Sequence, residues 1–257
     1  MMKPEFSTDL SGQVALVTGA TSGLGWRFAE VLAQSGAKVA LSGRRTARLE
    51  ELAASIADLG GTAEPVPLDV SSPSSFPEAV DAIEAELGPI TILVNNAGVP
   101  DAQYATAMSL GKINQVIDTN FRGAFALSTE VARRMIAAGT AGKMVNIASM
   151  TAFEYHENNA ASLYAMTKSA IVRMTETLAV EWSKFHINVN AIAPGLFESE
   201  MTSGMLERMS DAVVEQFPRK RICRPHQLDS ALLFLVSPSS DAVTGTIVKV
   251  DDGQGGR

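Results

Sequence analysis

The chain is poor in cysteine, because Cys223 is the only one among its 257 residues. One thiol cannot form an internal disulfide and is too little for a metal site, so we expect no metal. We interpret Cys223 as a buried small hydrophobe. Basic residues are also fewer than acidic ones, and the formal net charge is -7. That balance argues against a nucleic-acid partner, which would need a basic face.

Long apolar runs are missing as well. No stretch approaches the length needed to cross a bilayer, and residues 1–10 lack the apolar segment of a secretory signal. We therefore expect a cytoplasmic protein with no membrane partner. What the chain does have is 46% hydrophobic and 19% charged residues, the composition of an ordinary globular protein. Its length permits one large α/β domain or two small ones.

Short apolar runs alternate with longer amphipathic stretches along the whole chain. The runs predict strands at 14–18, 38–42, 63–68, 92–95, 143–148, 187–192 and 246–250. The amphipathic stretches predict helices at 25–35, 47–59, 74–87, 113–138, 162–185 and 227–236. This alternation indicates βαβ units on a parallel sheet covered on both faces. Because no linker, charge block or repeat divides the chain, we predict one doubly wound α/β domain over 1–257, with a short tail over 1–11.

A glycine-rich turn follows the first predicted strand. Gly19, Gly23 and Gly25 let the backbone turn tightly and approach a pyrophosphate at the start of the next helix. Their spacing, Gly-x3-Gly-x-Gly, differs from the Gly-x-Gly-x2-Gly of the common dinucleotide fingerprint. Such a turn alone can be plain turn chemistry. Its place between the first strand and first helix of a βαβ series predicts a dinucleotide site that includes Thr21, Ser22 and Leu24.

The end of the second predicted strand indicates which nicotinamide cofactor fits. Gly43 stands where an acidic side chain would bind the ribose 2′-hydroxyl of NAD. Two arginines follow, and their guanidinium groups suit the 2′-phosphate of NADP. We therefore predict that NADP(H) is favoured over NAD(H), with Arg44 as the principal contact and Ser42 and Arg45 as secondary ones. The alternative, open above all for Arg45, is a solvated charge at the start of the next helix.

Tyr164 and Lys168 stand four residues apart in a predicted helix and therefore share a face. An ammonium beside a phenol favours the phenolate, which would lower the tyrosine pKa from about 10 towards neutrality. Such a tyrosine can give or take a proton at physiological pH. Tyr155 is a competing tyrosine, but Asn159, four residues later, brings no positive charge.

Taken together, these motifs resemble the classical short-chain dehydrogenases/reductases over essentially the whole chain, from Gly12 to Gly253. The motifs, in order, are the glycine turn, Asn95-Asn96-Ala97-Gly98, Ser149, the Tyr164–Lys168 pair and Pro194-Gly195. The resemblance implies a Rossmann fold with a seven-stranded parallel sheet, and a catalytic tetrad of Asn120, Ser149, Tyr164 and Lys168. It also implies cofactor contacts from Asp69, Val70, Asn96, Ala97, Gly98, Tyr164, Lys168, Pro194, Gly195, Phe197 and Ser199.

The family assigns each member of the tetrad a role. Tyr164 would protonate the carbonyl oxygen as hydride arrives from the nicotinamide, or deprotonate an alcohol in the reverse direction. Lys168 would lower the tyrosine pKa and bind the nicotinamide ribose, and Ser149 would orient the substrate oxygen. Asn120 would hold a water that relays protons from Lys168 to solvent. The implied function is an NADP(H)-dependent oxidoreductase that interconverts a ketone and a secondary alcohol.

The substrate side departs from the family pattern. Ser149 and Tyr164 are 15 positions apart, about two more than the family pattern, which lengthens the segment 150–161 that walls the substrate site. The candidate substrate contacts are Ser149, Phe153, Tyr155, Tyr164, Met201 and Met205. For Phe153 and Tyr155, packing within the loop or against another subunit is an equal alternative. The two methionines belong to an apolar stripe in residues 196–218, which we predict to be a mobile lid that also packs on the core.

Several finer functions stay open. A 3-oxoacyl-[acyl-carrier-protein] reductase fits the length and motifs, and Arg133 and Arg134 could dock the carrier. Phe185-His186, however, stands where we would look for a second basic residue. An NAD-dependent sugar, polyol or alcohol dehydrogenase is another alternative. A non-catalytic dinucleotide-binding scaffold would typically lack the tyrosine or the lysine. The family further implies a small-molecule substrate and a homotetramer, or a homodimer, paired through helices 113–138 and 162–185.

Overall fold

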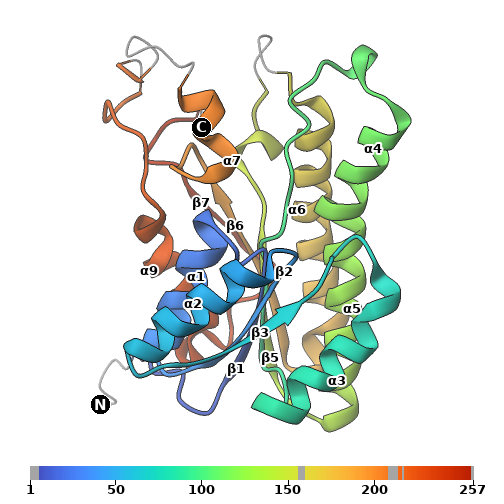
Figure 1. The fold of residues 1–257 in the computed structure, drawn as a ribbon, viewed down its shortest axis with the longest axis vertical. Helices are drawn as coiled ribbons and strands as arrows, with labels where there is room; N and C mark the ends of the chain where they lie inside the picture. Colours follow the sequence, from blue (N-terminus) through green and yellow to red (C-terminus); the bar gives the residue numbers. More distant parts are fainter. Residues whose placement is uncertain (1–5, 156–159, 208–213, 216, 256–257) are drawn as a thin grey trace.

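The computed structural model describes residues 6–155, 160–207, 214–215 and 217–255. Within these residues, seven strands form one parallel sheet in the order β3-β2-β1-β4-β5-β6-β7 (Figure 1). β1 pairs with β2 on one side and with β4 on the other, so the strand order reverses at β1. The strands are β1 (Val14–Thr18), β2 (Lys38–Gly43), β3 (Thr62–Pro67), β4 (Ile92–Asn95), β5 (Gly142–Ile147), β6 (Ile187–Pro194) and β7 (Ile247–Val250).

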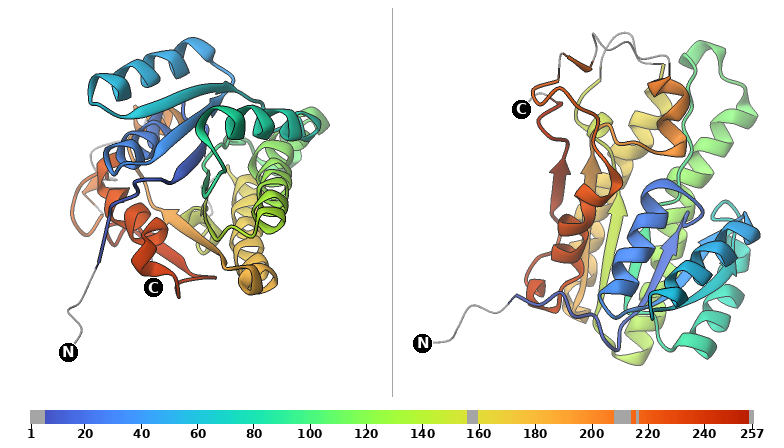
Figure 2. Two further views of the ribbon diagram at one scale, coloured as in Figure 1. Left: turned by 90° about the horizontal axis from the view of Figure 1, so that it is seen from below. Right: turned by 60° about the vertical axis from the view of Figure 1, so that its left-hand side comes forward.

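Helices cover both faces of this sheet (Figure 2). Alternate residues of a strand point to opposite faces, and β1 divides accordingly. Its Val14 and Leu16 pack with the α3, α5 and α6 side, whereas its Ala15 and Val17 pack with α1, α2 and α9. The helices are α1 (Gly23–Gln34), α2 (Thr46–Asp58), α3 (Phe76–Leu87), α4 (Leu110–Ile117), α5 (Gly123–Ala138), α6 (Ser162–Trp182), α7 (Glu200–Leu206) and α9 (Asp229–Val236).

The predicted doubly wound parallel sheet is confirmed, and every predicted strand is present with bounds within two residues. The helix predicted over 113–138 differs most. It begins earlier, at Leu110, and a π-helical turn at Asp118–Arg122 separates α4 from α5. The helix predicted to end at 185 ends as an α-helix at Trp182, and a 3-10 turn follows.

The predicted N-terminal tail is packed from Ser7 onward. Ser7 exchanges hydrogen bonds with two serines, accepting from Ser237 Oγ and donating to Ser239 Oγ. Leu10 is buried, and its N–H donates to the Ser35 carbonyl after α1. The apolar side chain of Leu10 explains this packing. Residues 1–5 lie outside the described part of the chain.

Cys223 is buried, as the sequence predicts, and burial raises the pKa of its thiol. In the residues that the structure describes, no helix is long and apolar enough to cross a membrane. Nor do three or more His, Cys, Asp or Glu side chains gather there as a potential metal site.

Candidate active site

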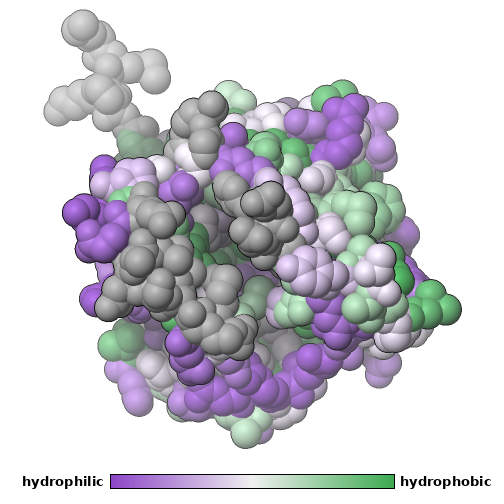
Figure 3. Space-filling model, turned by 90° about the horizontal axis from the view of Figure 1, so that it is seen from above, coloured by the Kyte–Doolittle hydropathy of each residue, from purple (hydrophilic) through white to green (hydrophobic). Residues whose placement is uncertain are grey.

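A cavity of about 620 Å³ opens at the carboxyl ends of the strands, on both sides of the point where the strand order reverses. Figure 3 looks onto this end of the molecule, where the surface is hollowed. Crevices at this position are the usual ligand sites of open parallel sheets. The predicted residues that line the cavity are Gly19, Thr21, Ser22, Gly23, Leu24, Arg44, Arg45, Asp69, Val70, Asn96, Ala97, Gly98, Ser149, Tyr164, Lys168, Pro194, Gly195, Phe197, Ser199 and Met201.

Other predicted residues do not reach the cavity wall. Ser42 is fully buried, and among the described residues its hydroxyl has no hydrogen-bond partner. Phe153 and Tyr155 are 42% and 48% exposed and lie outside the lining, so the structure does not bring them to the cavity. The Lys249 ammonium sits 4.1 Å from the centre of the Phe153 ring. Met205 belongs to α7, but its side chain lies outside the described part.

The glycine turn is held against the segment after β4 by close backbone contacts. Asn96 Nδ2 donates to the Thr18 carbonyl at 2.9 Å and to the Gly19 carbonyl at 3.2 Å. A Cβ on Gly25 would lie only 2.3 Å from the Gly19 oxygen and 2.4 Å from Asn96 Nδ2, so only glycine fits there. Gly25 thus allows the close packing that holds the turn, although it does not line the cavity. The first turn of α1 carries no acidic side chain, which suits an anion at the helix N-terminus.

The two arginines after β2 have different surroundings. Arg44 is 66% exposed, and its guanidinium is 4.0 Å from the Asp69 carboxylate. Burial would raise the pKa of Asp69, but hydrogen bonds from Ser71 and the charge of Arg44 lower it overall. Arg44 therefore offers most of its guanidinium to the cavity.

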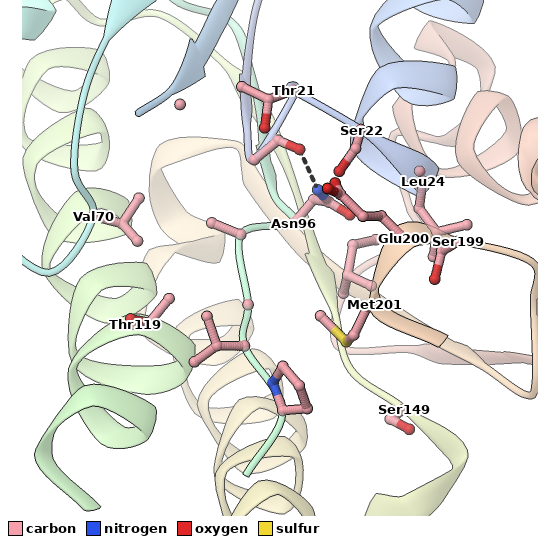
Figure 4. A pocket seen from close by; sticks show the side chains of 18 of the residues that line it. Thr21, Ser22, Leu24, Val70, Asn96, Thr119, Ser149, Ser199, Glu200 and Met201 are labelled. Carbon is pink, nitrogen blue, oxygen red and sulfur yellow. Dashed lines mark hydrogen bonds between the residues drawn. The ribbon is translucent and has the colours of Figure 1, made fainter. Parts of the chain in front are cut away.

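Arg45 is 47% exposed, but its guanidinium is paired on the cavity wall. It donates to Thr21 Oγ1 at 2.8 Å and to Ser22 Oγ at 3.0 Å. It also forms a bidentate pair with Glu200 of α7, at 2.7 and 2.8 Å. Hydrogen bonds from Arg45 lower the pKa of Glu200 to about 2. In Figure 4, Glu200 reaches across the cavity mouth towards Ser22.

Tyr164, Ser149 and Lys168 meet at the other end of the cavity. Ser149 follows β5, and its Oγ accepts hydrogen bonds from the N–H and the hydroxyl of Thr151. Its own proton therefore remains for the phenol oxygen of Tyr164, whose pKa the Ser149 hydroxyl lowers. The Lys168 ammonium is buried, donates to the Ile147 carbonyl at 2.7 Å and lies 5.6 Å from the centre of the Tyr164 ring.

The expected fall in the tyrosine pKa does not occur in the protein by itself. Burial is the largest effect and raises the pKa of Tyr164 to about 12; the Ser149 hydrogen bond opposes the rise, and the Asp101 carboxylate adds to it. Burial likewise lowers the pKa of Lys168 to about 8. The Lys168 ammonium favours the Tyr164 phenolate, but desolvation of both groups outweighs that attraction.

Asn120 lies in the π-helical turn and is buried. Its side chain holds Val99 through two hydrogen bonds. Asn120 Oδ1 accepts from the Val99 N–H at 2.8 Å, and Nδ2 donates to the Val99 carbonyl at 2.9 Å. A further hydrogen bond reaches Thr167 Oγ1 on α6 at 3.3 Å. Asn120 thus joins the loop after β4 to α6 at Thr167, the residue before Lys168, without lining the cavity. Single-turn π segments are frequent at functional sites.

Two acidic residues near the site, Glu200 and Asp101, are not among the residues predicted from the sequence. Glu200 lines the cavity, and its position directly after the predicted contact Ser199 could have indicated it. Asp101 is buried close to Tyr164 but 63 positions earlier in the chain, so no local pattern signals it. The cavity wall also includes Leu68, Val99, Pro100, Thr119, Ile147, Ala148 and Thr202.

Comparisons with known proteins agree with this fold. A family model described as enoyl-(acyl carrier protein) reductase matches residues 19–254. The 2-dehydro-3-deoxy-D-gluconate 5-dehydrogenase of Formosa agariphila is 33% identical over 95% of this chain and 93% of its own. The 3-oxoacyl-[acyl-carrier-protein] reductase of Vibrio cholerae is 34% identical over 95% and 98%. A crystal structure of a gluconate 5-dehydrogenase from Burkholderia cenocepacia, in complex with NADP and tartrate, is 32% identical, covers 96% of both chains and has a TM-score of 0.90.

Proposed function

The chain belongs to the short-chain dehydrogenase/reductase family of oxidoreductases, and on that premise we propose that it interconverts a ketone and a secondary alcohol with NADP(H). The observation that carries this proposal is the meeting of Ser149, Tyr164 and Lys168 at one end of a cavity whose other end holds the glycine turn. Proton chemistry and nucleotide binding thus share one space.

The residues around the cavity fit a nicotinamide dinucleotide. Gly19 and Gly25 pack tightly against the segment after β4 and so fix the turn, and the N-terminus of α1 suits a pyrophosphate. The nicotinamide, when bound, supplies or accepts the hydride. Arg44 offers an exposed guanidinium for a 2′-phosphate, which favours NADP(H) over NAD(H). The related gluconate 5-dehydrogenase with bound NADP supports this preference.

In this mechanism Tyr164 holds the proton that is exchanged with the substrate oxygen. Its high pKa keeps the phenol protonated, as carbonyl reduction requires. Ser149 donates a hydrogen bond that orients the substrate oxygen and opposes the build-up of charge on it. Lys168 supplies a buried positive charge one helical turn away. Asn120 fixes the loop after β4 against α6, and we assign it the proton relay that the family implies.

For the substrate we propose a small polyhydroxy ketone or secondary alcohol, with sugar acids as the first class to test. The relatives that act on gluconate derivatives support this class. The acyl-carrier alternative gains less support. The guanidinium of Arg134 pairs with Asp81 and Glu130, and that of Arg133 pairs with Glu130. Neither arginine is left as a free docking charge.

The experiment that tests the mechanism is the Tyr164→Phe substitution. We expect the turnover number for carbonyl reduction to fall roughly a thousand-fold, because the proton donor is lost. Binding of NADPH, measured by its fluorescence, should stay near wild type. Tyr155→Phe is the matched control, since Tyr155 lies outside the cavity wall. Turnover near wild type in Tyr164→Phe would exclude the tyrosine as proton donor.

The substrate class needs a separate measurement. We expect steady-state kcat/KM values with NADPH to be higher for keto sugar acids than for acyl thioesters. The reverse order would favour the acyl-carrier alternative. Binding of NADPH with no turnover across the whole panel would favour a non-catalytic scaffold.

A further inference from the structure

Asp101 is a buried acidic side chain beside Tyr164 for which the mechanism above has no role. It lies in the loop after β4, is only 2% exposed and is not among the described residues that line the cavity. Its carboxylate therefore does not meet a ligand there. An acid this deeply buried requires partners inside the protein.

The partners of Asp101 are backbone amides, one of which belongs to Tyr164. Asp101 Oδ2 accepts from the Tyr164 N–H at 3.0 Å, and Oδ1 accepts from the Ala102 N–H at 2.7 Å. Tyr164 is the third residue of α6, and its N–H is one of those that a helix leaves without an internal partner. Ala161, at the N-cap position, has no side chain that could accept it. Asp101 thus caps α6 from a different element.

The loop that carries Asp101 is itself firmly held. Ala102 adopts a left-handed backbone conformation with φ of 50°, which is unusual for a residue with a Cβ. The Pro100 carbonyl accepts from the Lys112 ammonium of α4 at 2.8 Å, and Val99 is clasped by Asn120. A strained turn persists when its surroundings determine it. Here the surroundings aim the Asp101 carboxylate at the first turn of α6.

The charged and polar groups around the Tyr164 phenol come from three elements. Lys168 approaches from α6 itself, Ser149 from the end of β5, and Asp101 from the loop after β4. A negative charge at the helix N-terminus also stabilises α6 through the helix dipole. Asp101 therefore acts on Tyr164 through both a hydrogen bond and a charge.

We propose that Asp101 is a positioning residue of the reaction, whose carboxylate holds the backbone of Tyr164 so that the phenol meets Ser149 and the substrate oxygen. This inference rests on the proposed function, because it concerns the same proton transfer. The charge of Asp101 has a second consequence. Because a nearby carboxylate disfavours the phenolate, its removal lowers the pKa of Tyr164.

Two variants separate the hydrogen bond from the charge. Asp101→Asn keeps an oxygen that can accept from the Tyr164 N–H but removes the charge. Asp101→Ala removes both. Ser109→Ala is the matched control, because it removes the side-chain cap of α4, in which Ser109 Oγ accepts from the Lys112 N–H, without touching α6.

In Asp101→Ala we expect kcat to fall roughly ten- to hundred-fold, because misplaced catalytic groups react slowly, with the KM for NADPH unchanged. Amide hydrogen exchange in the first turn of α6, measured by mass spectrometry, should become faster. In Asp101→Asn we expect exchange near wild type and an acid limb of the alcohol-oxidation profile that moves to lower pH. Ser109→Ala should leave kcat, the pH profile and α6 exchange unchanged.

Wild-type kcat and wild-type exchange in Asp101→Ala would overturn the proposal. An equal loss of NADPH affinity and kcat would also overturn it, since that pattern indicates general damage to the site. The exchange measurement needs no turnover. If wild-type protein reduces no carbonyl, the proposed function fails, and exchange alone then decides whether Asp101 holds α6.

Discussion

Burial of the Lys168 ammonium lowers the free energy of unfolding. Burial lowers its pKa from 10.5 to about 8. Between these values the unfolded chain binds a proton that the folded protein does not, so the free energy of unfolding rises with pH across this window. Below about pH 8 both states are protonated, and folding bears the full desolvation cost of the ammonium, on the order of 3 kcal/mol.

The Lys168→Met variant tests this linkage. Urea unfolding without added cofactor should give a wild-type stability that rises relative to the variant between about pH 8 and pH 10. The difference between the two proteins cancels the contributions of other groups that titrate in this window. Parallel pH profiles of the two proteins would mean that the pKa of Lys168 is the same in the folded and the unfolded state.

Arg44 is the residue to which we attribute the proposed choice of cofactor. In Arg44→Ala we expect the KM for NADPH to rise at least ten-fold and the KM for NADH to change little, because only NADPH carries the 2′-phosphate. Arg48→Ala is the matched control, since Arg48 lies nearby in α2 but pairs with Glu51 and packs over the Trp26 ring. Equal effects of Arg44→Ala on both cofactors would contradict the assignment.

At this scale the sequence predicts residue identities better than their environments. Tyr164 and Lys168 could be predicted because their spacing is local, and Ser149 could be predicted because it matches the family pattern. The pKa of Tyr164 could not, because it depends on burial and on Asp101, which arrives from the loop after β4. The pairing of Arg45 with Glu200 likewise joins two segments that only the fold brings together.

Among the elements, we propose that nucleotide binding depends on the junction of β1 and α1. Gly25→Ala places a methyl group within 2.4 Å of two atoms, so either α1 or the Asn96 contact must move. We expect a loss of about 1–3 kcal/mol in stability and an NADPH dissociation constant at least ten-fold higher. Thermal unfolding and a fluorescence titration measure the two effects.

Gly111→Ala serves as the control for that substitution. Gly111 lies in α4, where a Cβ would come no closer than 3.9 Å to another side chain. Because alanine favours helix over glycine by about 0.5–1 kcal/mol, this variant should be at least as stable as wild type. Wild-type cofactor affinity in Gly25→Ala would show that the close packing is dispensable.

Elements with strong periodicity were predictable, and interruptions inside them were not. Strands such as β1 and β4 are buried apolar runs bounded by turns, so their positions follow from hydrophobicity. The π-helical turn at Asp118–Arg122 has no such signal. It lies where Gly123 approaches the loop after β3 so closely that a Cβ would be 2.2 Å from the Val70 carbonyl oxygen. That constraint is tertiary, and only the assembled sheet imposes it.

At the scale of the whole molecule, one sheet supplies both ends of the cavity. The single-domain interpretation therefore predicts one cooperative transition in urea, with near-ultraviolet circular dichroism and NADPH binding lost together. Two separate transitions would contradict it. The homotetramer stays a prediction from the family resemblance. A light-scattering mass of four chains would support it, and a mass of one chain would exclude it.

The cavity draws its two chemical halves from opposite sides of β1, where the strand order reverses. The glycine turn follows β1 itself, whereas Ser149 and the Tyr164–Lys168 pair depend on β5 and α6. The reacting groups stand at the end of β5 and in the first turns of α6, whereas Met201 belongs to the short helix α7. Mutation can therefore remodel α7 without moving the proton path. In evolutionary terms, such a chain can change the substrate that it accepts while it keeps the same proton transfer.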